Sequence, residues 1–162
     1  MMEVAQNRIS IRMAVPGDAP AISSVLHEAF AEYKSLYTPE GFAATALAND
    51  QILRRMGEGP VWVALRDEVF IVGTGAAVPK GEALYVRGMA VLPASRGLRV
   101  GELLLRHIED FASAQGYKRL TLSTTPFLHH AIRLYERFGF RRTHEGPQDL
   151  FGTPLFTMVK DL

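Results

Sequence analysis

The chain has 162 residues, of which 48% are hydrophobic and 22% charged, and its formal net charge is +1 at pH 7. This length predicts a single domain over residues 1–162, and the small net charge argues against nucleic acid as a partner. The absence of cysteine excludes disulfides, thiolate zinc sites and cysteine nucleophiles. No apolar run has membrane-spanning length, and residues 1–8 do not resemble a signal peptide, so we expect a cytoplasmic protein without a membrane partner.

The first third of the sequence predicts a strand followed by helices. Residues 9–15 alternate apolar and polar side chains like a half-buried strand, and Pro16-Gly17-Asp18 then turns the chain, with Asp18 as a helix cap. The next helix is indicated by apolar residues at helical spacing, namely Ile22, Val25, Leu26, Ala29, Phe30 and Tyr33. Thr38-Pro39-Glu40 begins another helix. We expect it to break near Asn49-Asp50, where Asp50 caps a further turn or two to Met56.

Three strand patterns follow, at residues 61–66, 69–78 and 84–92, and the short turns between them imply antiparallel hairpins. A long helix then buries Leu104, Ile108, Phe111 and Ala112 and ends near Gly116. Because this helix separates a strand at 120–124 from the strand at 84–92, we expect those two strands to be parallel neighbours.

A helix at about 127–138, ended by Gly139, and strands at 140–144 and 155–159 complete the predicted order, β-α-α-β-β-β-α-β-α-β-β. This order predicts an α/β (α+β) fold with a mixed, mostly antiparallel sheet of about seven strands. Helices are expected on both faces of the sheet.

The turn before the long helix, SRGLRVG at residues 95–101, carries the clearest functional pattern. Two glycines leave bare backbone at a helix N-terminus, where unpaired N–H groups favour an anion such as phosphate. The spacing matches neither the P-loop nor the dinucleotide-binding pattern, and a turn of this kind taken alone is more often structural. However, residues 96–142 contain nine Lys or Arg against four acids, which places positive charge where a polyanionic ligand would lie.

The stretch MAVLPASRGLRVGELLLRHIEDFASAQG, followed by LTLSTTPFLHHAIRLYERFGFRRT, resembles the GNAT superfamily of acyl-CoA-dependent N-acyltransferases. The resemblance implies a GNAT-like sheet and acetyl-CoA (coenzyme A) as co-substrate, with no metal. In that family the backbone of an R/Q-x-x-G-x-G/A turn binds the pyrophosphate. The corresponding residues here are Arg96, Gly97, Leu98, Arg99, Val100, Gly101 and Glu102. The sequence departs from the family at Arg99, where glycine is usual, and at Leu128, where many members carry an asparagine that contacts pantetheine.

The resemblance also implies a catalytic arrangement. The backbone of Met89, Ala90 and Val91 would lie along the pantetheine, and the Val91 N–H would stabilise the oxyanion that forms when an amine attacks the thioester. Gly88 is where we expect the strand to bulge and open. Tyr135, in the family's LYE-x-x-GF motif, would contact the cofactor and protonate the departing thiolate. Considered without the motif, Tyr135 fits a packed core tyrosine better, because it shares a helix face with apolar residues.

The acceptor cannot be identified from the sequence. Candidates for its pocket are Tyr33, Tyr37, Tyr85 and Arg87, and candidate bases are Glu28, Glu32, Glu82 or a chain of waters. The predicted reaction is acetyl transfer from acetyl-CoA to a primary amine, on a small molecule or a peptide, by direct attack in a ternary complex. Two alternative functions stay open: a noncatalytic acyl-CoA sensor and an unrelated domain that binds a phosphorylated metabolite. The oligomeric state also stays open, between a monomer and a homodimer.

Overall fold

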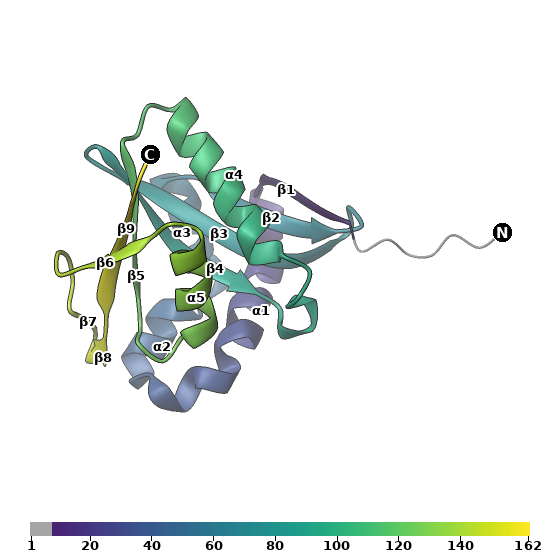
Figure 1. The fold of residues 1–162 in the computed structure, drawn as a ribbon. Helices are drawn as coiled ribbons and strands as arrows, with labels where there is room; N and C mark the ends of the chain where they lie inside the picture. Colours follow the sequence, from purple (N-terminus) through teal and green to yellow (C-terminus); the bar gives the residue numbers. More distant parts are fainter. Residues whose placement is uncertain (1–7) are drawn as a thin grey trace.

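The computed structural model describes residues 8–162 and contains a seven-stranded sheet in the order β1-β2-β3-β4-β5-β9-β6 (Figure 1). β4 and β5 are parallel and all other neighbours are antiparallel. The strands of this sheet are β1 (Ile9–Met13), β2 (Val61–Arg66), β3 (Phe70–Lys80), β4 (Ala83–Val91), β5 (Arg119–Thr124), β6 (Arg141–Thr143) and β9 (Phe156–Asp161). A separate small hairpin is formed by β7 (Asp149–Leu150) and β8 (Thr153–Pro154).

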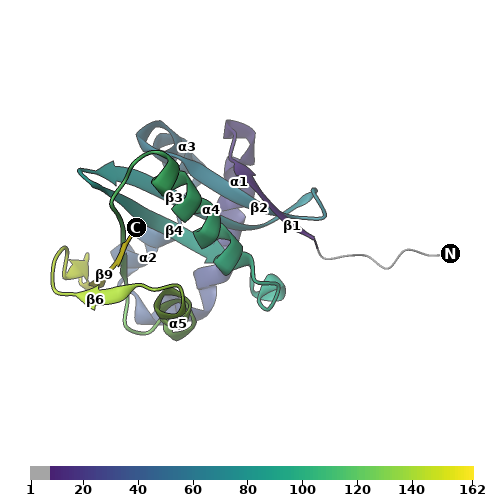
Figure 2. The same ribbon diagram turned by 45° about the horizontal axis from the view of Figure 1, so that its top comes forward.

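Five α-helices cover the two faces of the sheet: α1 (Ala19–Phe30), α2 (Pro39–Thr45), α3 (Asn49–Glu58), α4 (Val100–Ala114) and α5 (His129–Arg137). Short 3₁₀ helices occupy Pro16–Asp18, Ala31–Leu36 and Pro93–Ser95. Figure 2 shows α4 over the middle of the sheet and α5 beyond it, towards β6 and β9, with α1 and α3 on the opposite face. Within residues 8–162, no helix combines the length and apolar character needed to cross a bilayer.

The apolar run of β2 shows why this strand lies in the middle of the fold. Trp62 and Ala64 pack in the core beneath α4, while Val61 and Val63 pack in a second core beneath α1 and α3. Successive side chains of a strand point to opposite faces, so a strand covered on both sides needs apolar residues at every position. On α4, the buried face that meets the sheet consists of Val100, Leu104, Leu105, Ile108 and Ala112.

The predicted fold class is confirmed, including the mixed seven-stranded sheet, the hairpins and the parallel pair of β4 and β5, and the order of elements differs from the predicted one only in α3 and in β7 and β8. A parallel connection must return to the starting end of the sheet, and α4 provides that crossover. Thr38 also caps α2 as expected, because its Oγ1 accepts a hydrogen bond from the Gly41 N–H at 3.0 Å.

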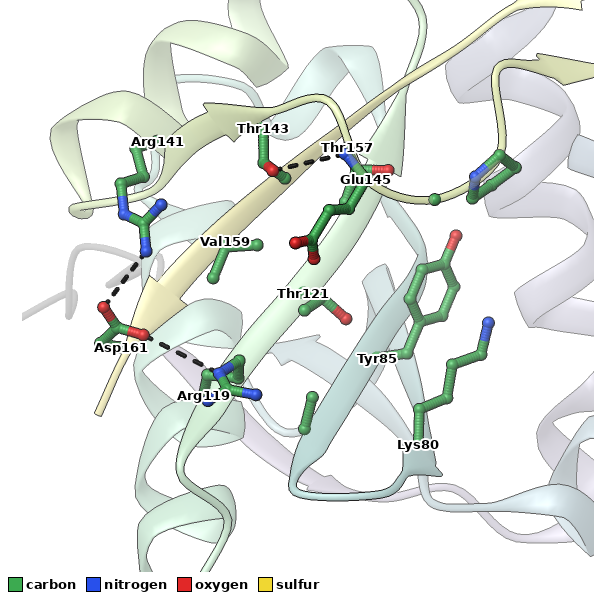
Figure 3. A pocket seen from close by; sticks show the side chains of 13 residues that line it. Lys80, Tyr85, Arg119, Thr121, Arg141, Thr143, Glu145, Thr157, Val159 and Asp161 are labelled. Atoms are coloured by element: carbon green, nitrogen blue, oxygen red, sulfur yellow. Dashed lines mark hydrogen bonds and ion pairs between the residues drawn. The ribbon is translucent and has the colours of Figure 1, made fainter.

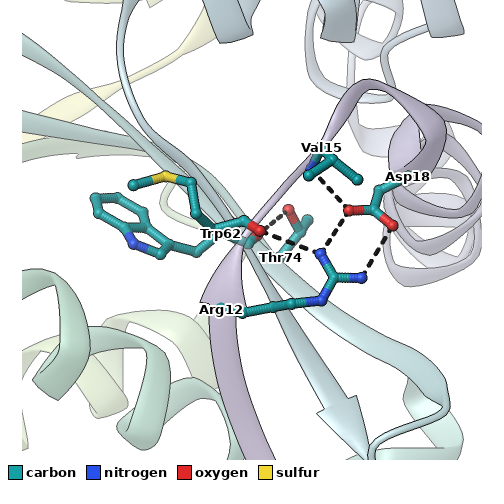
Figure 4. A network of polar contacts seen from close by, with 6 residues as sticks. Arg12, Val15, Asp18, Trp62 and Thr74 are labelled. Atoms are coloured by element: carbon teal, nitrogen blue, oxygen red, sulfur yellow. Dashed lines mark hydrogen bonds and ion pairs between the residues drawn. The ribbon is translucent and has the colours of Figure 1, made fainter.

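The expected cap at Asp18 is wrong. Its carboxylate accepts a hydrogen bond from the Val15 N–H at 2.8 Å and pairs with Arg12 at 2.7 Å, so it closes the 3₁₀ turn before α1 (Figure 4). The hydrogen bond from Arg12 lowers the pKa of Asp18. This ion pair joins the end of β1 to the start of α1.

The break after α2 was placed correctly, but the helix that follows is longer than predicted. α3 runs for ten residues, and its first turn is closed by Gln51, whose Oε1 accepts from the Ala48 N–H at 3.0 Å. Asp50, the expected cap, instead pairs with Arg54 on the surface at 3.2 Å. The small β7–β8 hairpin was not predicted, because strands of two residues carry no periodicity.

Candidate functional site

The gap between β4 and β5 is the centre of the candidate site. Thr74 of β3 pairs with Ala90 of β4, and Ala76 pairs with Arg87. Between these pairs, β3 has one residue, Gly75, and β4 has two, Gly88 and Met89, so β4 bulges there as predicted. Gly88 has φ +63°, a left-handed conformation that glycine adopts without strain. Pairing of β4 with β5 ends at Val86 and Leu122, although both strands continue. The two strands therefore separate beyond the bulge.

The backbone of Val91 has a donor that faces this gap. The N–H of the next residue, Leu92, donates to the Val72 carbonyl of β3 at 2.8 Å. Because consecutive N–H groups in a strand point to opposite sides, the Val91 N–H points away from β3 and towards the separated β5. Within residues 8–162, no strand pairs with β4 on this side beyond Val86, so the Val91 N–H is a donor without a strand partner there.

The turn formed by residues 96–102 presents a cluster of unpaired backbone donors. The Arg96 and Leu98 N–H groups are bonded inside the turn, to the carbonyls of Pro93 and Ser95, and the Leu103 N–H begins the bonding of α4. Among residues 8–162, no acceptor is bonded to the N–H groups of Gly97, Arg99, Val100, Gly101 or Glu102. Left-handed residues within such a turn direct successive amides towards one point, which is the geometry of an anion-binding nest.

A groove of about 500 Å³ runs from this turn to the β4–β5 gap, between α4 and α5. Of the predicted cofactor residues, it is lined by Met89, Ala90, Val91, Arg96, Gly97, Arg99, Val100, Gly101, Glu102 and Tyr135. Leu98 is the exception, because its side chain packs against the core and does not reach the groove. Three polar α5 residues that the sequence analysis did not assign to the site, His130, Arg133 and Arg137, line it too. For Arg133 and Arg137 a signal was present, because both belong to the basic excess of residues 96–142.

The charged side chains of the turn are held by carboxylates. Arg96 pairs with Glu32 of the 3₁₀ segment after α1 at 2.5 Å. Arg99 donates two hydrogen bonds to Glu102, at 2.9 and 3.0 Å, and its side chain points outward, as expected. These hydrogen bonds from Arg99 are the main reason that the pKa of Glu102 is lowered.

The conformation of Arg99 explains why glycine is usual at this position. Arg99 has φ +61°, in the left-handed region that costs a residue with a Cβ some strain. We expect Arg99→Gly to leave the melting temperature unchanged or to raise it. Glycine removes the strain from the folded state, and this gain offsets the stability lost because glycine has more conformational freedom in the unfolded chain. Coenzyme A affinity should fall by less than about tenfold, as for loss of one exposed charge. A larger loss in calorimetry would make the Arg99 side chain a principal ligand.

Tyr135 lies where the groove meets a second pocket. The residue is 7% exposed, and its ring packs edge-on against Phe140, with ring centroids 5.8 Å apart. Burial raises the pKa of Tyr135, and no hydrogen bond to its hydroxyl is found among the described residues. Tyr135 lines both cavities, as do Phe30, Met89 and Leu128. It is therefore a core residue whose position also gives it access to both cavities.

The second pocket, of about 280 Å³, lies on the other side of Tyr135. It contains three of the residues expected around an acceptor, Tyr37, Tyr85 and Arg87, whereas Tyr33 lines the groove instead. The sequence analysis missed Arg55 of α3 in its wall. A signal existed, because Arg55 falls on the same helical face as Ile52 and Met56, where an apolar residue would be usual.

Leu150 of β7 and Leu155, which follows β8, line this pocket. Thr38 fastens the hairpin to α2: its N–H donates to Thr153 Oγ1 at 2.9 Å and its Oγ1 donates to the Phe151 carbonyl at 2.8 Å. The candidate bases Glu28, Glu32 and Glu82 line neither the groove nor the second pocket. Glu32 pairs with Arg96, and Glu82 pairs with Lys118 at 3.2 Å.

A third cavity, of about 520 Å³, lies over β4, β5, β9 and β6 and touches the second pocket only through Tyr85 (Figure 3). Its arginines are neutralised within the protein: Asp161 pairs with Arg141 at 3.3 Å and with Arg119 at 3.9 Å. It contains neither the 96–102 turn nor Tyr135. The groove and the second pocket therefore form the candidate site.

Comparison with known proteins gives relatives of one kind. The uncharacterized N-acetyltransferase YjgM of Escherichia coli strain K12 is 30% identical over 145 residues, covering 86% of each chain. Matches to other curated acetyltransferases are shorter, covering 36% to 52% of this chain and 31% to 54% of theirs.

Solved structures agree in fold. The PaiA N-acetyltransferase of Thermoplasma acidophilum, crystallised in complex with coenzyme A, superposes with a TM-score of 0.81 at 16% identity, covering 96% of this chain and 99% of its own. The ribosomal-protein-S18-alanine N-acetyltransferase of Escherichia coli has a TM-score of 0.75 at 18% identity, covering 95% and 94%. The sequence profile of the Acetyltransferase (GNAT) family matches residues 22–140, which include the 96–102 turn and Tyr135, and the chain belongs to this family.

Proposed function

We propose that the protein transfers an acetyl group from acetyl-CoA to a primary amine by direct attack in a ternary complex. The observation that carries the proposal is the meeting of two cavities at Tyr135 and the β4–β5 gap. One cavity ends at a cluster of unpaired amides suited to a pyrophosphate, and the other, of about 280 Å³, is large enough to hold a small amine. Direct transfer requires such a junction, because the amine and the thioester must lie within bonding distance of each other.

The 96–102 turn would hold the pyrophosphate through the amides of Gly97, Arg99, Val100, Gly101 and Glu102. Charge-assisted hydrogen bonds from several amides at one helix N-terminus are strong and need no lysine or metal. The four arginines that line the groove, Arg96, Arg99, Arg133 and Arg137, would add attraction for the phosphates. The coenzyme A complex of the structurally similar PaiA supports this assignment.

Attack of the amine converts the thioester carbonyl into a tetrahedral oxyanion. The Val91 N–H would donate to this oxygen, from a strand whose geometry is fixed by its pairing with β3. A donor that is already oriented lowers the barrier, because it need not reorganise as the charge develops. Collapse of the intermediate breaks the C–S bond and forms the amide.

The Tyr135 hydroxyl would donate its proton to the departing sulfur. Its raised pKa keeps it protonated at neutral pH, so the acid is always in the correct form. An ordinary tyrosine, with pKa about 10, is a weaker acid than a thiol of pKa about 8.5, so the transfer alone is uphill. The attacking nitrogen gains positive charge on bonding to the carbonyl carbon, and the proton it loses can restore the hydroxyl.

This assignment predicts the pH dependence of kcat. Burial raises the pKa of Tyr135 above the ordinary value of about 10, so its acid form persists to higher pH than in an exposed tyrosine. We expect kcat to rise with pH as the amine loses its proton, and to stay level up to about pH 10. Initial rates between pH 6 and 10 test this. An alkaline decline centred below pH 9 would show that the essential acid is not Tyr135.

A noncatalytic acyl-CoA sensor is the second candidate, since a binding protein needs the groove but not the hydroxyl. The deciding experiment offers a panel of primary amines with acetyl-CoA and measures the release of free thiol. Thiol release that depends on the amine, with acetylated amine found by mass spectrometry, supports the enzyme. Binding of acetyl-CoA with no transfer to any amine supports the sensor.

A further inference from the structure

Arg55 is the one cation of the second pocket that has no carboxylate within ion-pairing distance among residues 8–162. It extends from the inner face of α3 to the bulge of β4, where its Nη1 lies 2.5 Å from the position that a Cβ on Gly88 would occupy. The guanidinium thus occupies the space that glycine leaves open, one residue from Met89, which lines both cavities.

The charges around Arg55 are unbalanced. Its nearest charged neighbour in the pocket, Arg87, is neutralised by Glu58, whose Oε1 lies 2.6 Å from Arg87 Nη2. Among the residues that the structure describes, no Asp or Glu lines the pocket. Burial, followed by the charge of Arg87, lowers the pKa of Arg55 to about 10 and outweighs the opposing charge of Glu58, which lies outside ion-pairing distance of Arg55, so the protein holds this cation in an unfavourable setting. A partly buried charge without a partner costs stability, and such positions are characteristic of functional sites.

The remaining wall limits the size and character of the occupant. Apolar and aromatic side chains dominate it: Phe30, Tyr37, Met89, Leu128, Leu150 and Leu155. The volume of about 280 Å³ is at the small end for ligand pockets. A dication such as a polyamine would meet two arginines and no acid, whereas an amine that also carries an anion would supply the missing partner.

We propose that the acceptor is a small amino acid with an apolar side chain, whose carboxylate pairs with the Arg55 guanidinium while its amine points to the β4–β5 gap. This inference rests on the proposed acetyl transfer and names its substrate class. A guanidinium can hold a carboxylate through two parallel hydrogen bonds, which fixes orientation as well as affinity.

The lining of the pocket would also assist the reaction. An ammonium group that leaves water for this largely apolar pocket loses its proton more readily, because burial disfavours its charged form. The pocket would in this way favour the free amine that attacks the thioester, although no carboxylate base lines it.

The first test compares acids with their amides. L-Leucine, L-methionine and L-phenylalanine are offered with acetyl-CoA beside their carboxamides, with spermidine as a dicationic amine, and kcat/KM is measured by thiol release. We expect each acid to exceed its amide by about 10- to 100-fold, the usual effect of a hydrogen-bonded charge pair. Equal rates for acid and amide, or a preference for spermidine, would overturn the inference and leave acetyl transfer itself supported.

The second test changes the cation. We expect Arg55→Met to abolish the preference for acid over amide, Arg55→Lys to restore part of it, and Arg54→Gln to leave it unchanged. Arg54 is the control because it neighbours Arg55 but lies on the surface, paired with Asp50. Arg55→Met should not lower the melting temperature, since it removes an unpaired cation. A preference that survives Arg55→Met would assign the carboxylate to another group.

A third measurement does not depend on turnover. Calorimetry in the presence of coenzyme A compares N-acetyl-L-leucine with N-acetyl-L-leucinamide, which are the products of the two reactions. Tighter binding of the acid to the natural protein but not to Arg55→Met supports the anion site even if no amine is acetylated. Equal binding of the two products, or binding of neither, would refute it.

Discussion

Tyr135→Phe is expected to lower kcat by ~10²–10⁴-fold, the range in which a general acid contributes, while the Kd for coenzyme A changes little. The substitution keeps the ring and its edge-on contact with Phe140, and removes only the hydroxyl at the junction of the two cavities. Because that hydroxyl makes no hydrogen bond with the described residues, its removal should shift the melting temperature by less than about 3 °C.

Tyr117→Phe is the matched control, since Tyr117 also packs at the edge of the same core but lines none of the three cavities. It should retain the kcat of the natural protein. Tyr135 would be removed from the mechanism if Tyr135→Phe turned over a good acceptor at nearly the natural rate. If the melting temperature of Tyr135→Phe fell so far that unfolding explained the lost activity, Tyr135 would have a packing role alone.

Gly101→Val is expected to weaken coenzyme A binding by roughly 100-fold or more, as for loss of two charge-assisted hydrogen bonds. Gly101 lies in the groove at the start of α4, and a Cβ there would point towards α5, 2.8 Å from Leu134 Cδ2. A valine would therefore fill the space between α4 and α5 through which the cofactor must reach the amides. Calorimetry with coenzyme A measures the effect.

The contact with Leu134 gives glycine a packing role as well, and a double variant separates the two roles. Leu134→Ala removes the side chain that valine would meet. If the glycine serves the phosphates, Gly101→Val should still reduce affinity strongly in the Leu134→Ala background. Recovery of the Leu134→Ala affinity in the double variant would mean that Gly101 serves only helix packing, and that the pyrophosphate binds elsewhere.

Local patterns predicted most elements of this fold because the physical cause of each lies within a few residues. Alternation in β1, helical spacing in α4 and the Thr38-Pro39 start of α2 require no knowledge of distant residues. The errors occurred where partners came from elsewhere or where an element was very short. Asp18 is bonded to Arg12 of the preceding strand, and the β7–β8 hairpin is held by Thr38, more than a hundred residues earlier.

The sequence by itself determined the family, the glycine-bearing turn before α4 and the bulge of β4 at Gly88, because glycines, a helix start and a motif are read along the chain. Only the tertiary structure decided what lines the two cavities. It showed that Leu98 faces the core, that Tyr33 belongs to the groove, and that the three candidate glutamates lie outside both cavities. It also brought Arg55 of α3 to the bulge of β4. The contact between Arg55 and Gly88 cannot be predicted from the sequence, because it depends on how α3 packs across the sheet.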